Sequence, residues 1–103
     1  MNLLLLLLAC AEPCEESFQL EDELSAGQVD DALSYWVLSD PAELTCEQVC
    51  ASVYELSREG YAVRSVTSCD MGLDVEAAQA AGDDPDALVG NILCAGWALQ
   101  EGC

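Results

Sequence analysis

Seven cysteines constrain the fold of this chain more than any other feature. One of them, Cys10, ends an apolar N-terminal run, and six follow it: Cys14, Cys46, Cys50, Cys69, Cys94 and Cys103. An even number of cysteines in a small domain outside the reducing cytoplasm predicts a disulfide framework. We therefore expect these six thiols to form structural bridges.

A metal site is the competing use of the thiols. Cys46 and Cys50 are three residues apart, but structural zinc sites usually combine two short cysteine spacings or add histidine, and this chain does neither. The C-x-x-C motif of thiol oxidoreductases is also missing from the sequence. We expect no metal and no cofactor.

The charge balance excludes whole classes of partner. The chain has 20 acidic and 2 basic residues, with a formal net charge of −18. Binding to DNA or RNA requires clustered lysine or arginine, so nucleic acids are excluded, and anionic lipid headgroups are repelled. The electrostatic partners that remain are cations and basic proteins. Because 52% of the residues are hydrophobic, the chain is expected to fold in spite of this charge.

The N-terminus predicts export. A helix over the apolar run from Leu3 to Ala9 would be about 10 Å long, too short for a membrane core of about 30 Å but typical of a signal peptide, here residues 1–9. The segment Leu7-Leu8-Ala9-Cys10 resembles the lipobox of bacterial lipoprotein precursors. This resemblance implies that Cys10 carries diacylglycerol as the first mature residue, and that Ala11 favours the outer membrane. Ordinary secretion with cleavage after Ala11 is the alternative.

Two helices are predicted downstream of an acidic tether over residues 10–27, in which the alternation of Phe18 and Leu20 allows a short edge strand. Apolar residues recur with helical spacing from Gln28 to Leu38, where Ser39-Asp40-Pro41 ends the pattern. The second helix begins at Thr45, whose hydroxyl can form a capping box with Gln48, and it ends at Gly60.

Two strands are predicted for the remainder of the domain. Tyr61 to Cys69 is rich in β-branched residues, and a strand there needs a partner. Ala87 to Leu99 carries conflicting signals, because its apolar spacing fits a helix while Gly90 and Gly96 oppose one. We choose the strand, since it provides the partner, and expect 75–86 to be a loop with a turn or two of helix. The predicted fold is a small disulfide-rich α+β domain over residues 28–103, with two helices packed on a short antiparallel sheet.

The predicted elements suggest a disulfide pairing. Cys46 and Cys50 share one face of the second helix and should each reach a different cysteine. A strand running back from Gly60 brings Cys69 near Cys46 and leaves Cys50 for Cys94, so that Cys14 and Cys103 join the ends. Residues 45–103 contain the C-x3-C helix, Ser68-Cys69, the segment 90–96 and the terminal cysteine. In these features they are similar to small cysteine-rich modules of predicted bacterial lipoproteins. Those modules have no assigned activity.

Candidate chemistry outside the cysteines is sparse. Without histidine and lysine, the usual general base and Schiff-base amine are missing, and no nucleophile or phosphate-loop motif is present, so no catalytic residue is predicted. Carboxylates that could bind calcium occur in two expected loops, but neither matches a calcium-loop motif. They are Asp70, Asp74 and Glu76 in the first, and Asp83, Asp84 and Asp86 in the second. Both Trp36 and Trp97 fall on apolar periodic positions and are expected in the core.

These observations predict a non-enzymatic, lipid-anchored acidic lipoprotein of the cell envelope that acts in binding or as a structural component. The alternative is a freely secreted small protein that binds calcium or a basic protein.

Overall fold

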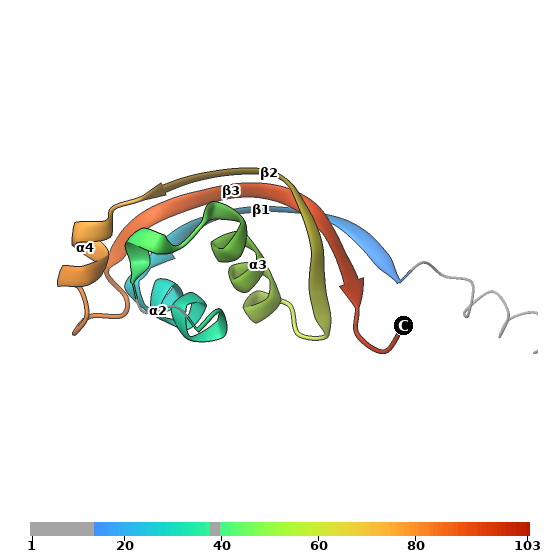
Figure 1. Ribbon diagram of the computed structural model, residues 1–103, viewed down its shortest axis with the longest axis horizontal. Helices are drawn as coiled ribbons and strands as arrows, with labels where there is room; N and C mark the ends of the chain where they lie inside the picture. The colour runs from blue at the N-terminus through green and yellow to red at the C-terminus, as the bar shows by residue number, and fades with distance from the viewer. Residues whose placement is uncertain (1–13, 38–39) are drawn as a thin grey trace, which may run out of the picture.

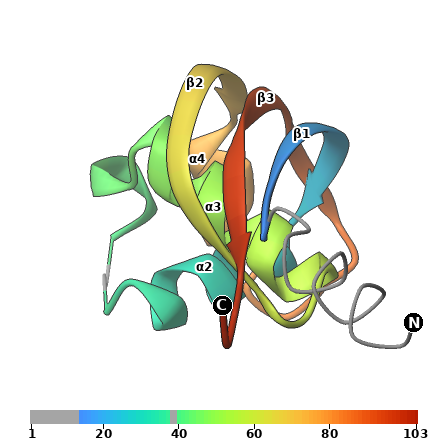
Figure 2. The same ribbon diagram turned by 90° about the vertical axis from the view of Figure 1, so that its right-hand side faces the viewer.

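The computed structural model describes residues 14–37 and 40–103. Its elements are the strands β1 (Glu15–Ser25), β2 (Tyr61–Leu73) and β3 (Leu88–Gln100), the helices α2 (Ala26–Tyr35), α3 (Cys46–Ser57) and α4 (Val75–Ala80), and the 3-10 turn η1 (Pro41–Glu43). The strands form one antiparallel sheet in the order β1-β3-β2. The last strand in sequence is therefore the central one (Figure 2).

The sheet is curved, and its two faces differ (Figure 1). Helices α2 and α3 lie against the concave side, and α4 lies at one end of the sheet. Among the described residues, no helix lies over the convex side. We call this convex surface the outer face.

Strand alternation and one face of α3 build the core. On the inner side of the sheet, Phe18, Ile92 and Cys94 are buried, and they belong to the same cluster as Val49 and Cys50 of α3. Because successive strand residues point to opposite faces, the inner row of β3 fixes its outer row as Leu93, Ala95, Trp97 and Leu99.

A close backbone approach explains Gly96, which lies in the inner row of β3. A Cβ atom there would overlap the backbone oxygen of Ser65 and lie 3.1 Å from the Phe18 ring. The Phe18 ring in turn stacks on Tyr54 of α3, with 4.1 Å between ring centroids. Only glycine leaves room for this layer of the core.

Capping boxes mark the N-termini of both larger helices, α2 and α3. The predicted capping box of Thr45 and Gln48 is present at α3, and Ser25 forms a second one with Gln28 at α2. Helix α2 ends at Tyr35, so its expected end at Leu38 was too late, and Leu38 itself lies outside the described residues. The residue Val37 follows the helix with φ 57°, a left-handed conformation that usually requires glycine.

Within the segment expected to be an acidic tether, residues 15–25 form β1, an edge strand of 11 residues that is longer than the short one allowed by the alternation of Phe18 and Leu20; residues 10–13 lie outside the described part of the chain. Strand β1 pairs with β3 from Glu15↔Leu99 to Ser25↔Leu88. Its acidic residues hid the period of two, in which Phe18 and Leu24 point inward while Glu21 and Glu23 point outward. The globular domain therefore begins before residue 28.

The predicted and observed elements also differ in their lengths and in the number of helices. The strand chosen for 87–99 is confirmed as β3, and the strand expected over 61–69 continues to Leu73. The strands have 11 to 13 residues, so the sheet is not short. The expected loop over 75–86 contains α4, a third helix capped by Asp74. The described helices are all too short or too polar to span a membrane.

Candidate functional site

Three disulfides cross-link the domain in the pairing expected from the sequence. Cys46 and Cys50, one turn apart on α3, bond to Cys69 of β2 and Cys94 of β3 respectively, and Cys14 bonds to Cys103. The two strand cysteines are direct cross-strand partners. The helix is thus bonded to two adjacent strands. The predicted lipidation residue Cys10 and the signal peptide 1–9 lie outside the described residues.

Two of these bridges lie side by side in the core. The sulfur atoms of Cys50, Cys69 and Cys94 are all within 4.8 Å of one another. Each belongs to a disulfide, and a disulfide sulfur is not the thiolate that zinc requires. In this oxidised form the cluster is a covalent support for the sheet.

The carboxylates proposed for calcium do not converge. Asp70 lies in β2, and Asp74 caps α4 by accepting a hydrogen bond from the Ala77 amide at 3.0 Å, so the expected first loop does not exist. Asp84 accepts a hydrogen bond from the backbone amide of Asp86 at 3.1 Å. Within the described ranges, no three carboxylates are close enough to share one cation.

Both tryptophans are partly exposed, so their expected place in the core was wrong. Trp36 is 38% exposed, and its indole N–H donates a hydrogen bond to the backbone carbonyl of Gln48 at 2.9 Å. Trp97 is 46% exposed on the outer face. The sequence did contain the signal for Trp97, because a strand that turns Ile92 and Cys94 inward must turn Trp97 outward.

The outer face carries an apolar stripe along its central strand. Four consecutive outward positions of β3 are apolar, namely Leu93, Ala95, Trp97 and Leu99. Leu93 is 46% exposed, like Trp97. An antiparallel sheet with one solvated face normally presents polar residues there. This stripe therefore differs from an ordinary solvated face.

Polar and acidic side chains flank the stripe. Trp97 lies between Ser17 of β1 and Ser65 of β2, whereas Leu93 lies between Glu21 and Asp70. Glu15 and Glu23 continue the acidic border on β1, opposite Leu99 and Asn91. Carboxylates from both neighbouring strands therefore border the stripe at Leu93, whereas serines border it at Trp97.

A hollow of about 720 Å³ lies at the Leu93 end of the stripe. Gly72 matters for its shape, because a Cβ atom there would lie 2.6 Å from the side-chain oxygen of Asn91. The lining residues come from all three strands: Glu21, Asp22, Glu23, Asp70, Gly72, Asn91, Ile92 and Leu93. The hollow is acidic with one apolar wall.

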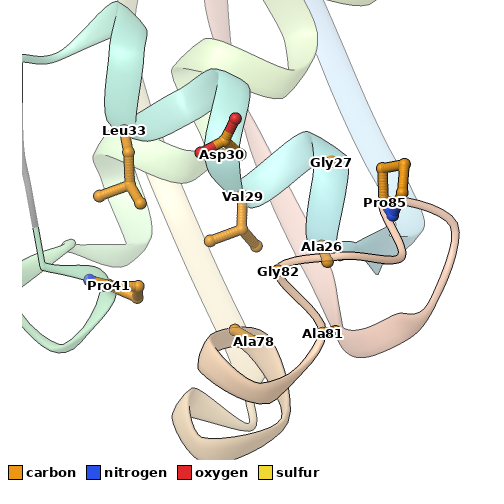
Figure 3. Close-up of a pocket in the computed structure, with 10 residues that line it drawn as sticks. All are labelled: Ala26, Gly27, Val29, Asp30, Leu33, Pro41, Ala78, Ala81, Gly82 and Pro85. Carbon is orange, nitrogen blue, oxygen red and sulfur yellow. The ribbon is translucent and has the colours of Figure 1, made fainter.

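Two smaller cavities lie elsewhere. One of about 160 Å³ is formed by α2, α4 and the neighbouring turns, with Val29, Leu33 and Pro41 among its lining residues and Asp30 as its carboxylate (Figure 3). Another, of about 220 Å³, lies beside Trp36 between α3 and residues 63–66 of β2. The polar side chains that line the second cavity are Glu47, Gln48, Arg64 and Ser65.

The one ion pair found among the described residues joins β1 to α3. The Glu16 carboxylate lies 2.6 Å from the Arg58 guanidinium and accepts a hydrogen bond from the Tyr54 hydroxyl at 2.9 Å. Arg58 also covers the Tyr61 ring, 4.3 Å from its centroid. Burial, together with the hydrogen bond and charge of Glu16, raises the pKa of Tyr54. This cluster links β1 to α3 at the end of the sheet opposite the acidic hollow.

Comparisons with family models, curated proteins and solved structures found no match for this chain.

Proposed function

We propose that this chain is a non-enzymatic, lipid-anchored acidic protein of the cell envelope that acts by binding. The observation that carries the proposal is the set of three disulfides, which uses all six cysteines after Cys10. Such bridges persist in oxidising compartments and are rare in the reducing cytosol. Export to the periplasm or the cell surface accounts for them.

The pairing also singles out Cys10. Every other thiol has a partner, so the cysteine of the lipobox-like segment Leu7-Leu8-Ala9-Cys10 is the odd one. Lipidation would consume this last thiol and fasten a protein whose charge is repelled by anionic headgroups. The outer membrane is the proposed location.

A binding role agrees with the chemistry of the surface. The chain contains no histidine or lysine, and the sulfurs of its six paired cysteines are not free nucleophiles. In contrast, the outer face exposes Leu93 between two carboxylates and Trp97 between two serines, and an exposed aromatic residue in an apolar stripe is typical of a contact surface.

Mass spectrometry of the protein recovered from cells tests the anchor. We expect a mature N-terminus at Cys10 carrying diacylglycerol, release of the protein into the soluble fraction on Cys10→Ser, and retention in the membrane of the matched control Ala11→Ser. An unmodified protein beginning at Glu12 would contradict the anchor and support the freely secreted alternative. Thiol titration of the same sample should find the six downstream cysteines oxidised, and six free thiols would overturn the export proposal.

A further inference from the structure

We propose that the outer face docks a cationic polypeptide, whose apolar side chains pack along β3 while its lysine or arginine side chains pair with carboxylates of β1 and β2. The inference rests on the proposed binding function and adds to it the surface and the chemical class of the partner.

The apolar stripe provides the contact area. The six residue steps from Leu93 to Leu99 extend about 20 Å along the strand. A helix of about 13 residues covers the same length. Trp97, near the middle of the stripe, has small neighbours in Ser17 and Ser65, so its ring is accessible to a partner from above.

The borders of the stripe select the sign of the partner's charge. Glu21 and Asp70 lie on either side of Leu93, and both side chains are exposed and make no hydrogen bond or ion pair within the described residues. A second copy of this chain would bring another formal charge of −18 to the same place, and an anionic lipid surface would also be repelled. A cationic polypeptide is the macromolecule that complements this face.

The hollow beside Leu93 suits the side chains of such a partner. Carboxylates of Glu21, Glu23 and Asp70 line it, and Leu93 forms an apolar wall. Lysine and arginine pack their aliphatic stems on apolar surface while their charged ends reach polar groups. Its volume of about 720 Å³ leaves room for such a side chain without rearrangement of the strands.

The edges of the sheet are less suited to a partner than its face. Strand β2 pairs with β3 through two register shifts, next to Val63 and Val66, and such irregularities twist an edge away from strand addition. The Val63 amide is already occupied, because it donates a hydrogen bond to Glu55 at 2.7 Å. Charged residues along β1 protect the other edge in the same way.

Calorimetric titration of the oxidised protein tests the proposal. The probe is a 14-residue amphipathic helical peptide of leucine and lysine, and the controls are peptides with serine for leucine or glutamate for lysine. We expect the leucine–lysine peptide to bind at one site, and both controls to bind at least about tenfold more weakly. Equal binding of the serine peptide would overturn the role of the stripe.

Paired variants locate the site. One double variant combines Glu21→Gln with Asp70→Asn beside the stripe. The control double variant combines Asp83→Asn with Asp86→Asn in the turn before β3, and it removes the same charge. We expect the first to weaken binding about threefold to tenfold more than the second.

Likewise, Trp97→Ser should weaken binding by more than about tenfold, and Leu88→Ser, at another exposed apolar position of β3, by less than about twofold. Equal losses within either pair would overturn the proposal. The lipid on Cys10 is measured separately by mass spectrometry, so failure of docking is distinguishable from failure of the anchor.

Discussion

Replacing both Cys14 and Cys103 by serine should lower the free energy of unfolding by about 4 kcal/mol, although the bridge contributes little to the core. Cys103 is exposed and Cys14 only half-buried, so few native contacts are lost. The β1–β3 pairing that begins at Glu15↔Leu99 remains to hold the ends together. The effect therefore acts mainly on the unfolded chain, which gains conformational entropy when its ends separate.

The magnitude follows from the length of the closed loop. The two cysteines are 89 residues apart. With the Cys50–Cys94 bridge intact, the shortest covalent path between them falls to about 45 residues, for which loop-closure entropy gives about 4 kcal/mol. The dependence on length is logarithmic, so a full-length path would add only about half a kcal/mol.

Urea denaturation at 25 °C without reductant measures this effect. In urea we expect a larger m-value, because the unfolded chain of the variant exposes more surface. In a separate thermal scan we expect the melting temperature to fall by about 15–30 °C. The near-ultraviolet circular dichroism of the folded variant should match that of the parent. A loss below about 1 kcal/mol with an unchanged m-value would refute the reasoning, since the ends would then be constrained in the unfolded chain without the bridge.

Four further outcomes are expected. Val37→Asn should raise the free energy of unfolding by about 1 kcal/mol, because asparagine tolerates the φ of 57° better than valine, whereas the control Val37→Ala should gain less; equal gains would exclude backbone strain as the cause. The pKa of Tyr54 is raised in the folded state, so its contribution to the free energy of unfolding is complete below pH 10 and is lost as the pH rises through the folded pKa. Denaturation between pH 8 and 12 should therefore show a smaller fall in the free energy of unfolding for Tyr54→Phe than for the parent. Parallel curves would contradict this. Gly96→Ala should destabilise the fold by more than about 3 kcal/mol or prevent folding. The control Gly82→Ala, whose Cβ would make an ordinary contact at 3.7 Å, should lower the free energy of unfolding by less than about 1 kcal/mol. Similar losses for the two variants in chemical denaturation would contradict the close packing of Gly96 against Ser65 and Phe18. Added NaCl should raise the melting temperature by screening the net charge of −18, and a flat series from dilute to molar salt would count against self-repulsion.

The sequence predicted the central strand for a structural reason. Local signals in 87–99 favoured a helix as much as a strand, but the strand at 61–69 needed a partner for its backbone groups, and β3 is that partner. The disulfide pairing followed from the same placement, because it depended on a helix and a strand running in opposite directions from Gly60.

The parts that sequence reasoning missed are those where charge hides periodicity. In β1, acidic residues occupy outward positions and also two inner ones, Glu16 and Asp22, so the alternation of Phe18 and Leu20 indicated at most a short edge strand. Glutamate and aspartate are also poor strand formers by local propensity. Only the unused hydrogen-bonding edge of β3, a tertiary feature, makes this segment a strand.

The order of the strands has a consequence for how the protein is made. Strands β1 and β2 are bonded to β3 and not to each other, and β3 is the last of the three to be synthesised. Until its residues are available, neither earlier strand has a neighbour, and a lone strand does not persist in water. The sheet therefore cannot close until its last strand has been synthesised, and neither can the Cys50–Cys94 and Cys14–Cys103 bridges, whose second cysteines lie in β3 and after it.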